Sequence, residues 1–323
     1  MKILLIDADS TIPNLALMKL STWYKKMYSA TVILKRLNIP YYPNKAKTFH
    51  NINTEGYDLS FCSIIFEGSE KYVKGENIIY GGSGVLPAVY LTKEIDECEP
   101  DYWLYSYEYV ADTSYGFISR GCIRHCSFCK VHVLEGNIIQ VSTIDKIVKH
   151  SKVKFLDNNF LALPNHEELL NELIDKNIKC QFNQGLDIRL VTESNSKLLS
   201  QLNYFGEYIF AFDNITYKQN IKKQLKLLNW RKPFNFKFFV YIHPDMNLKE
   251  TKERILWLKR NKCLPYIMRD VTCWSSEYEK FYTDLAGYCN QVFAFKKLSF
   301  IKFLKRRHTS NSRIERSFEL WKQ

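Results

Sequence analysis

Short apolar runs alternate with amphipathic stretches along most of the chain after residue 115. The runs are rich in β-branched and aromatic residues, whereas the stretches between them repeat apolar residues at helical spacing. In residues 165–176, for example, Leu169, Leu170 and Leu173 lie on one helical face. The pattern predicts strands at 116–120, 153–157, 178–183, 208–213, 236–242 and 266–269, with helices near 143–150, 165–176, 193–203, 216–228, 249–262 and 276–289.

Strand–helix units in series favour a parallel sheet with helices on its outer side. We therefore predict an α/β protein whose core, residues 113–295, is a partial (β/α)6 TIM-like barrel. Several helix starts carry capping signals: Asn247 is a predicted N-cap, and Ser142 and Ser276 each precede an acidic residue at capping-box spacing.

The first 112 residues follow a less regular pattern and predict a smaller α/β domain. Residues 2–6 and 59–66 read as strands, and residues 13–37 and 86–97 read as helices. Residues 296–323 form a separate basic C-terminal tail. The sequence thus predicts three parts, with limits at 112 and 295.

Composition narrows the class of protein. The chain has 323 residues and nine Cys that are too scattered for a disulfide framework, whereas small secreted disulfide scaffolds are short and Cys-dense. Its first residues resemble no signal peptide, because Asp7 and Asp9 interrupt the apolar run. No apolar stretch approaches the length of about 18 residues that a membrane span needs. These features predict a protein of the reducing cytoplasm.

The net charge of +12 is unevenly distributed. The tail, residues 296–323, carries 9 Lys and Arg against 2 Asp and Glu, and Phe300, Phe303, Phe318 and Trp321 lie among them. Such a tail is suited to binding nucleic acid, with lysines on phosphates and rings on bases. The alternative is an amphipathic helix that docks on the barrel, since Phe300 and Phe303 share one helical face.

The main candidate for chemistry is Cys122-x3-Cys126-x2-Cys129, which directly follows the first predicted strand of the barrel. Three thiolates can hold three irons of a [4Fe–4S] cluster and leave the fourth iron open, whereas electron-transfer sites usually have four Cys. Three alternatives remain: a zinc-dependent nucleic-acid-binding module in which His132 completes a Cys3His site, a Cys126–Cys129 redox pair, and three core thiols.

The spacing, with Phe128 just before the last Cys, resembles the signature of the radical S-adenosylmethionine (radical SAM) superfamily. The resemblance covers residues 110–295. It implies that Cys122, Cys126 and Cys129 bind a [4Fe–4S] cluster whose open iron chelates S-adenosyl-L-methionine (SAM). It further implies reductive cleavage of SAM to a 5′-deoxyadenosyl radical, hydrogen abstraction from a substrate that the sequence does not identify, and a one-electron reductant such as a flavodoxin or ferredoxin. Phe128 would lie against the adenine.

Polar residues follow the second predicted strand of the barrel. In this superfamily a polar segment at that place meets the ammonium group of SAM. Asp157, Asn158 and Asn159 occupy the matching positions, although the Gly-Gly-Glu form of the motif is absent. Carboxylate and amide oxygens are suitable acceptors for an ammonium group. The alternative is an Asx turn that ends the strand.

The third strand is followed by a polar segment that resembles one in radical SAM proteins with cobalamin-domain-like N-terminal regions. Asn183, Gln184, Asp187 and Arg189 are its candidates for facing SAM or substrate, and an Asp187–Arg189 structural ion pair is the alternative. Asp213, Asn214 and His243, after later strands, are weaker candidates.

The same resemblance extends to the N-terminal residues, which look like the Rossmann-like domain of cobalamin-dependent radical SAM enzymes. Those proteins carry Asp-x-His-x-x-Gly to ligate cobalt, and His50 here lies in no such motif. We therefore expect no cobalamin.

Cys180, Cys263, Cys273 and Cys289 could hold an auxiliary cluster, but their separations are long, and core thiols are the default interpretation.

Overall fold

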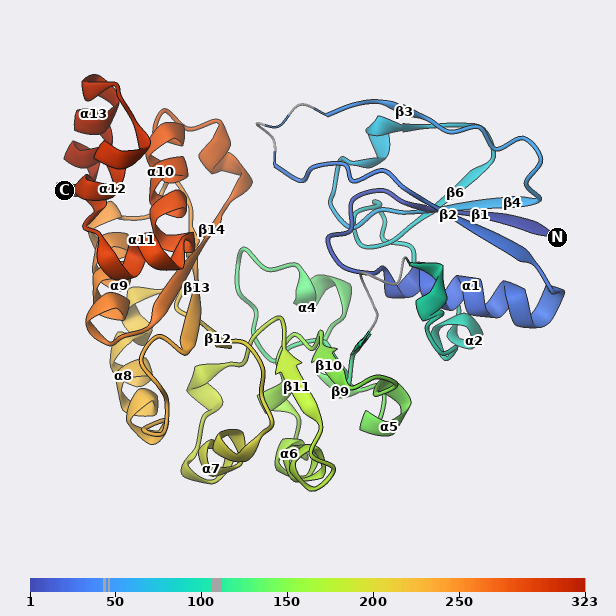
Figure 1. The fold of residues 1–323 in the computed structure, drawn as a ribbon, viewed down its shortest axis with the longest axis horizontal. Coiled ribbons are helices and arrows are strands. Elements are labelled where there is room, and N and C mark those ends of the chain that lie inside the picture. The colour runs from blue at the N-terminus through green and yellow to red at the C-terminus, as the bar shows by residue number, and fades with distance from the viewer. Residues whose placement is uncertain (43–44, 46, 106–111, 323) are drawn as a thin grey trace. The chain divides into compact units, whose positions relative to one another are not determined.

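The structure is a computed structural model that describes residues 1–42, 45, 47–105 and 112–322. It divides into two compact units (Figure 1). The first comprises Met1–Gly116 with Asp145–Ser151, and the second comprises Phe117–Ile144 with Lys152–Gln323. Each unit is described by itself, and the domain limits predicted from the sequence stay a prediction.

The first unit is built on a parallel sheet in the order β2-β1-β4-β6. Strand β1 is buried on both faces: Ile3 and Leu5 pack in one apolar cluster, and Leu4 and Ile6 in another. Its elements are β1 (Lys2–Asp7), α1 (Leu15–Tyr28), β2 (Thr31–Arg36), β3 (His50–Asn51), β4 (Leu59–Ser63), β5 (Val73–Lys74), β6 (Ile78–Gly81), α2 (Lys93–Asp96), β7 (Thr113–Gly116) and, after its first residue, α5 (Ile144–Ile147).

Two helices predicted in this unit are present but shorter than predicted. The predicted helix 13–37 ends at Tyr28, because Ser29 adopts a left-handed conformation with φ 48°. The β-branched residues Thr31, Val32 and Ile33 then continue as β2. Of the predicted helix 86–97, only the short α2 is helical; Pro87 lies at the start of that segment and has no N–H to donate.

The second unit contains two groups of parallel strands, β10–β11 and β12–β13–β14. Leu186 N, after β11, donates to Ile209 O of β12 at 2.8 Å and so links the two groups. Its elements are β8 (Ser119–Arg120), α4 (Val131–Leu134), β9 (Ile139–Gln140), β10 (Lys152–Phe155), α6 (His166–Asp175), β11 (Lys179–Phe182), α7 (Glu193–Gln201), β12 (Tyr208–Ala211), α8 (Lys218–Leu227), β13 (Phe236–Ile242), α9 (Leu248–Arg260), β14 (Leu264–Arg269), α10 (Glu279–Asn290), α11 (Val292–Lys297), α12 (Phe300–Arg307) and α13 (Asn311–Lys322).

The predicted α/β class with parallel sheets is confirmed, whereas closure into a partial (β/α)6 barrel stays a prediction. The predicted strand 116–120 is corrected, because two short strands, β7 and β8, replace it. The predicted helix 143–150 is likewise shortened to the four residues of α5.

The predicted helix starts have different outcomes. Asn247 caps α9 as predicted, since its side chain accepts from Lys249 N at 2.9 Å. The start predicted at Ser276 is wrong, because α10 begins at Glu279 and its N-cap residue is Tyr278. A polar side chain at capping-box spacing therefore does not by itself fix where a helix begins.

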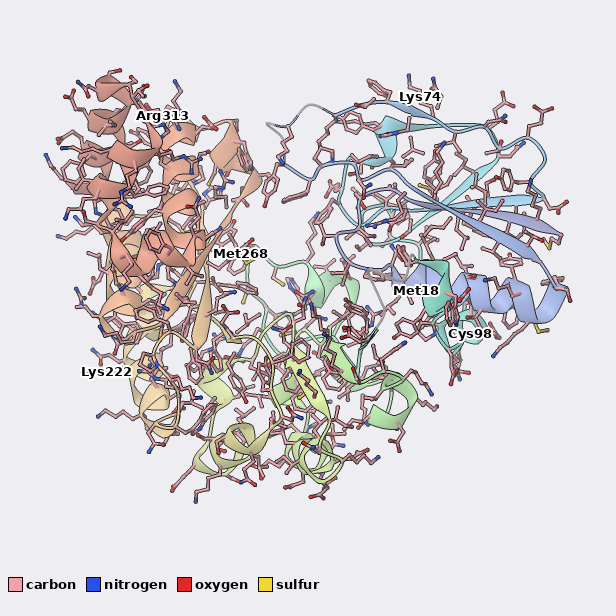
Figure 2. All side chains as sticks on the ribbon, viewed as in Figure 1. Met18, Lys74, Cys98, Lys222, Met268 and Arg313 are labelled. Atoms are coloured by element: carbon pink, nitrogen blue, oxygen red, sulfur yellow. The ribbon has the colours of Figure 1, made fainter. Side chains whose placement is uncertain are left out.

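The basic tail folds as helices, and α12 and α13 contact α10. Phe300 and Phe303 are buried, and the Phe303 ring lies 5.7 Å from that of Tyr288 on α10. The carboxylate of Asp284 on α10 is fully buried and accepts from His308 Nε2 at 2.7 Å. Arg313, labelled in Figure 2, donates to the same carboxylate at 3.2 Å. The arrangement matches the docked-helix alternative.

We expect Asp284→Ala to lower the free energy of unfolding by roughly 3 kcal/mol, because it removes a fully buried carboxylate that accepts hydrogen bonds from His308, Arg313 and Ser317. Urea denaturation of the full-length chain measures the change. Glu315→Ala is the matched control, since Glu315 is an exposed acidic residue of α13. Equal stability of the two variants would show that Asp284 does not hold the tail in place.

Candidate functional site

The three cysteines of the motif lie on one loop between β8 and α4. Cys122, Cys126 and Cys129 are each partly exposed. Cys129 N donates to Cys126 O at 3.0 Å, which forms a tight turn between these two residues. The Sγ of Cys122 lies 3.3 Å from Arg124 N and 3.5 Å from Asn159 Nδ2, two donors suited to a thiolate.

The two ends of this loop are fastened together. Glu135 accepts from Arg120 Nη1 at 2.8 Å and from Gly121 N at 2.9 Å, and Cys122 N donates to Gly136 O at 3.1 Å. Gly121 has φ +80°, and a Cβ there would collide with the backbone of residues 136–137, so the position requires glycine. Sequence reasoning missed Glu135, although a signal was available: it is the only Asp or Glu in residues 113–144.

The arrangement of possible ligands distinguishes the two metal interpretations. Among the described residues, no three His, Cys, Asp or Glu side chains are grouped closely enough to hold one metal ion, so the Cys3His zinc site is not assembled. His132 Nδ1 is nevertheless buried without a partner in the described structure, which favours the zinc alternative. An iron–sulfur cluster needs no such convergence, because each thiolate binds a different iron. The absence of a converged group among the described residues therefore bears on the zinc interpretation and does not test the cluster.

Asp157 lies just after β10 and is almost fully buried. Its carboxylate accepts from Ser119 N at 2.5 Å, from Ser119 Oγ at 2.6 Å and from Ile118 N at 3.2 Å. Burial raises the pKa of Asp157 to about 6, although these hydrogen bonds act in the opposite direction. Its oxygens thus fasten the segment that leads into the cysteine loop.

Raising the pH from about 4 to 6 should reduce the stability advantage of the unmodified apo-protein over Asp157→Asn. The folded-state pKa lies above the usual value, so the folded chain holds the proton more tightly and loses stability as the proton leaves. The loss is at most roughly 3 kcal/mol for a shift of this size. Urea denaturation of both proteins at several pH values measures this loss. A stability advantage of the unmodified protein that grows with pH would contradict a raised pKa of Asp157.

The two asparagines after Asp157 have different surroundings. Asn158 Nδ2 donates to Glu135 at 2.7 Å and so connects β10 to the closure of the cysteine loop. Asn159 is buried; its Nδ2 faces Cys122 Sγ, and its Oδ1 is buried without a hydrogen-bond partner among the described residues. A buried acceptor without a partner is rare in proteins. Asn159 therefore offers an acceptor beside the cysteine loop.

The segment after β11 also meets the loop. Asp187 accepts from Arg124 Nε at 2.8 Å and from Arg189 Nε at 2.7 Å. Burial would raise the pKa of Asp187, but the hydrogen bonds and charges of Arg189 and Arg124 outweigh it and lower the pKa. The Asp187–Arg189 ion pair weighed as an alternative is therefore present, and Arg124 extends it to the cysteines. Asn183 is partly buried and Gln184 is exposed.

Phe128 stacks on Tyr241, with ring centroids 4.1 Å apart and an interplanar angle of 14°. Tyr241 lies near the end of β13, and its hydroxyl donates to Asp270 at 2.7 Å. Asp213, after β12, accepts from Tyr241 N at 2.9 Å, and burial raises its pKa. His243 Nε2 lies 3.9 Å from Asp270 Oδ1. These contacts place Phe128 over the carboxyl ends of the later strands.

Asn214, the remaining weak candidate, has a local structural role. Its side-chain oxygen accepts from Thr216 N and from Thr216 Oγ1 at 2.9 Å each. These bonds cap the short helical turn that follows β12. The structure thus gives Asn214 a partner that is unrelated to the cysteines.

Arg254 on α9 is a buried residue that sequence reasoning missed. Its Nη1 donates to Phe212 O and Asp213 O at 2.9 Å each and to Tyr241 O at 3.2 Å. Burial lowers its pKa to about 10. The guanidinium thus joins the carboxyl ends of β12 and β13. The available signal was an arginine on the apolar face of a helix, beside Ile255.

Four further cysteines, which the sequence left as core thiols or an auxiliary cluster, are buried. Burial raises the pKa of Cys180 to about 12 and those of Cys263 and Cys273 to about 11. Cys289 is likewise buried. None belongs to a metal-binding group in the described part of the chain. Their surroundings are those of core thiols.

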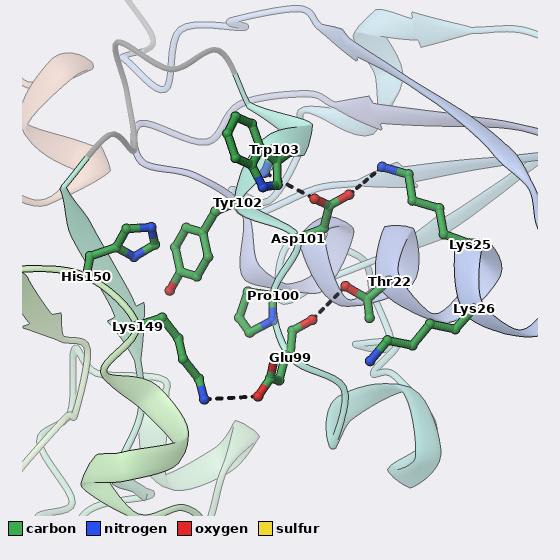
Figure 3. Close-up of a pocket in the computed structure, with 10 residues that line it drawn as sticks. All are labelled: Thr22, Lys25, Lys26, Glu99, Pro100, Asp101, Tyr102, Trp103, Lys149 and His150. Carbon is green, nitrogen blue, oxygen red and sulfur yellow. Dashed lines mark hydrogen bonds and ion pairs between the residues drawn. The ribbon is translucent and has the colours of Figure 1, made fainter.

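The first unit contains a pocket of about 410 Å³ (Figure 3). Its carboxylates are paired with lysines: Lys25 lies 2.6 Å from Asp101, and Lys149 lies 3.0 Å from Glu99. None of the site residues predicted from the sequence lines the pocket.

Over the described residues, no helix is both long and apolar enough to cross a membrane.

Comparison with known proteins gives a match to solved structures. No family model and no curated protein matches the chain. A solved structure, the radical SAM methyltransferase TsrM from Kitasatospora setae with tryptophan substrate and a SAM analogue bound, is similar over 82% of this chain and 72% of that chain. The TM-score is 0.53 and the sequence identity is 10%. The chain therefore has a fold related to that of this radical SAM methyltransferase.

Proposed function

We propose that the protein is a radical SAM enzyme. The observation that carries the proposal is the position of the cysteine loop in this fold: Cys122 lies beside Asn159, and Arg124 of the same loop binds Asp187. Residues that follow two neighbouring parallel strands thus contact the cysteine loop, at the strand ends where α/β proteins build their sites. The radical SAM-related fold supports the same conclusion.

Cys122, Cys126 and Cys129 would hold the [4Fe–4S] cluster. When bound, the cluster would supply the electron that cleaves SAM to methionine and a 5′-deoxyadenosyl radical. The backbone N–H of Arg124 donates to Cys122 Sγ, and such hydrogen bonds stabilise the thiolate and tune the potential of a metal site. Glu135 joins the two ends of the loop that carries the three thiols.

Asn159 and Arg189 are the residues that we assign to SAM. The Oδ1 of Asn159 is a buried acceptor without a partner among the described residues and would receive a hydrogen bond from the ammonium group. Arg189, fixed by Asp187, would pair with the carboxylate. Asp157 would act through Ser119, as a positioning residue. Phe128 would provide a flat apolar surface for the adenine.

We propose further that the enzyme works without cobalamin. At the carboxyl ends of β1 and β4, where a Rossmann-like sheet binds its ligand, Asn14 Nδ2 donates to Ser10 Oγ at 2.9 Å and to Ser63 Oγ at 2.8 Å. Asp9 accepts from Ile65 N at 2.8 Å. The polar side chains at these strand ends thus form hydrogen bonds within the protein. The sequence also lacks the cobalt-ligating motif. The proposal places the enzyme in a reducing compartment, with a flavodoxin or ferredoxin as reductant.

The test is anaerobic reconstitution with iron and sulfide, followed by incubation with SAM and dithionite. We expect brown protein with about four irons per chain and formation of 5′-deoxyadenosine, detected by mass spectrometry. Protein without the three cysteines is the control. A colourless protein that binds one zinc per chain would instead support the zinc module, and iron binding without SAM cleavage would restrict the site to electron transfer.

A further inference from the structure

A basic and aromatic surface lies at the amino-terminal ends of β13 and β14, within the second unit. It is formed by the turn before β13, the turn before β14, and helix α11. We call it the basal surface. Its residues are Lys232, Phe234, Lys262, Phe293, Lys296 and Lys297.

The fold holds these three segments together. Phe234 N donates to Lys262 O at 2.6 Å, and Arg231 Nη1 donates to Asn261 O at 3.0 Å, so the two turns are joined. Lys296 Nζ of α11 lies 4.7 Å from the centroid of the Phe234 ring, and Lys262 Nζ lies 5.9 Å from it. Residues distant in the sequence thus surround one ring.

The basal surface is uniformly positive. Residues 228–236, 261–263 and 291–297 contain no Asp or Glu, and Lys232, Lys262, Lys296 and Lys297 are all exposed. Lys237, at the start of β13, is by contrast paired with Glu207 at 3.1 Å. Clustered like charges are unfavourable to folding, but they attract a polyanion and raise its rate of association.

An exposed ring accompanies the lysines. Phe293 is 65% exposed, and Lys296 and Lys297 follow it three and four residues later, on the same side of α11. The tail offers no such ring at Phe300 or Phe303, which are buried, and the Trp321 ring packs 5.1 Å from that of Phe300. Base stacking is therefore available on the basal surface, and not on those tail residues.

We propose that the basal surface binds single-stranded nucleic acid. Lysines spaced around the partly buried Phe234 ring and the exposed Phe293 ring suit phosphates and bases together. A bilayer would require a larger apolar face. The surface lies at the strand ends opposite to Asn159 and Asp187, so it would dock a partner away from the cysteines. The inference goes beyond the proposed function and does not depend on it.

The test measures binding of a dye-labelled 20-nucleotide oligouridylate to the full-length protein by fluorescence anisotropy at several salt concentrations. Replacement of Lys232, Lys262 and Lys296 by Gln should weaken binding by roughly tenfold and reduce the salt slope by about 2, since each contact contributes about 0.7. Phe293→Ala should weaken it by roughly fivefold or more.

The matched control replaces Lys26, Lys179 and Lys197 by Gln, which removes the same charge from exposed positions elsewhere. Binding by this control like that of the unmodified protein supports the proposal. Equal weakening by both triple variants would overturn it, because net charge alone would then explain binding. Absence of binding to oligouridylate, or binding only to vesicles with 30% phosphatidylserine, would also overturn it. Circular dichroism confirms that the variants fold.

Discussion

Replacement of any one of Cys122, Cys126 or Cys129 by Ala is expected to remove most of the iron that the reconstituted protein binds. A cluster held by three thiolates has no spare protein ligand, so the loss of one leaves two irons open. Formation of 5′-deoxyadenosine should fall by more than about 100-fold, since even changes to the hydrogen-bond partners of metal ligands cost about 10- to 100-fold.

The matched control is Cys98→Ala, a partly exposed cysteine of the first unit that lies in no predicted site. It should keep its iron and its activity. Iron analysis and absorption at about 400 nm, where iron–sulfur clusters absorb broadly, measure the outcome. Full iron in any of the three loop variants would contradict the ligand assignment, and iron loss in Cys273→Ala would revive the auxiliary cluster.

Arg254→Met should lower the free energy of unfolding by about 3 kcal/mol. The variant keeps a long apolar side chain but removes the donors to three carbonyl groups, and each buried acceptor left unpaired costs about 1 to 3 kcal/mol. Loss of a buried charge offsets part of this cost. Urea denaturation of the apo-protein measures the change.

Arg260→Met on the same helix is the control, because Arg260 lies at the end of α9 and is not among its buried residues. It should change stability by less than about 0.5 kcal/mol. We also expect Arg254→Met to weaken SAM binding, since Tyr241, which stacks on Phe128, loses its support. An Arg254→Met variant as stable as the control would contradict this account of the buried guanidinium.

The later strands could be predicted because their apolar runs are long and regularly spaced. β13, Phe236–Ile242, has the predicted limits. The cysteine loop could be found because its three ligands are local in sequence. β2 was missed although Thr31, Val32 and Ile33 indicated a strand, because the apolar residues on either side of Ser29 fit one helical period.

Residues that act through distant partners could not be predicted in the same way. Arg254, Asp284 and Glu135 are charged, and charged residues are assigned to the solvent unless their partners are known. Their partners are 41 residues away for Arg254 and Asp213, and 24 residues away for Asp284 and His308. Only the folded chain shows that each of them neutralises or satisfies a buried group.

Closure of the cysteine loop has a consequence for the entropy cost of ordering that loop. Because Glu135, Gly121 and Gly136 join the two ends of the loop with protein groups alone, this closure needs no metal ligand. Joining the ends during folding removes part of the conformational entropy of the loop, so less would remain to be lost on binding a cofactor. A cofactor that bound the three cysteines would thus meet a loop whose ends are already held together.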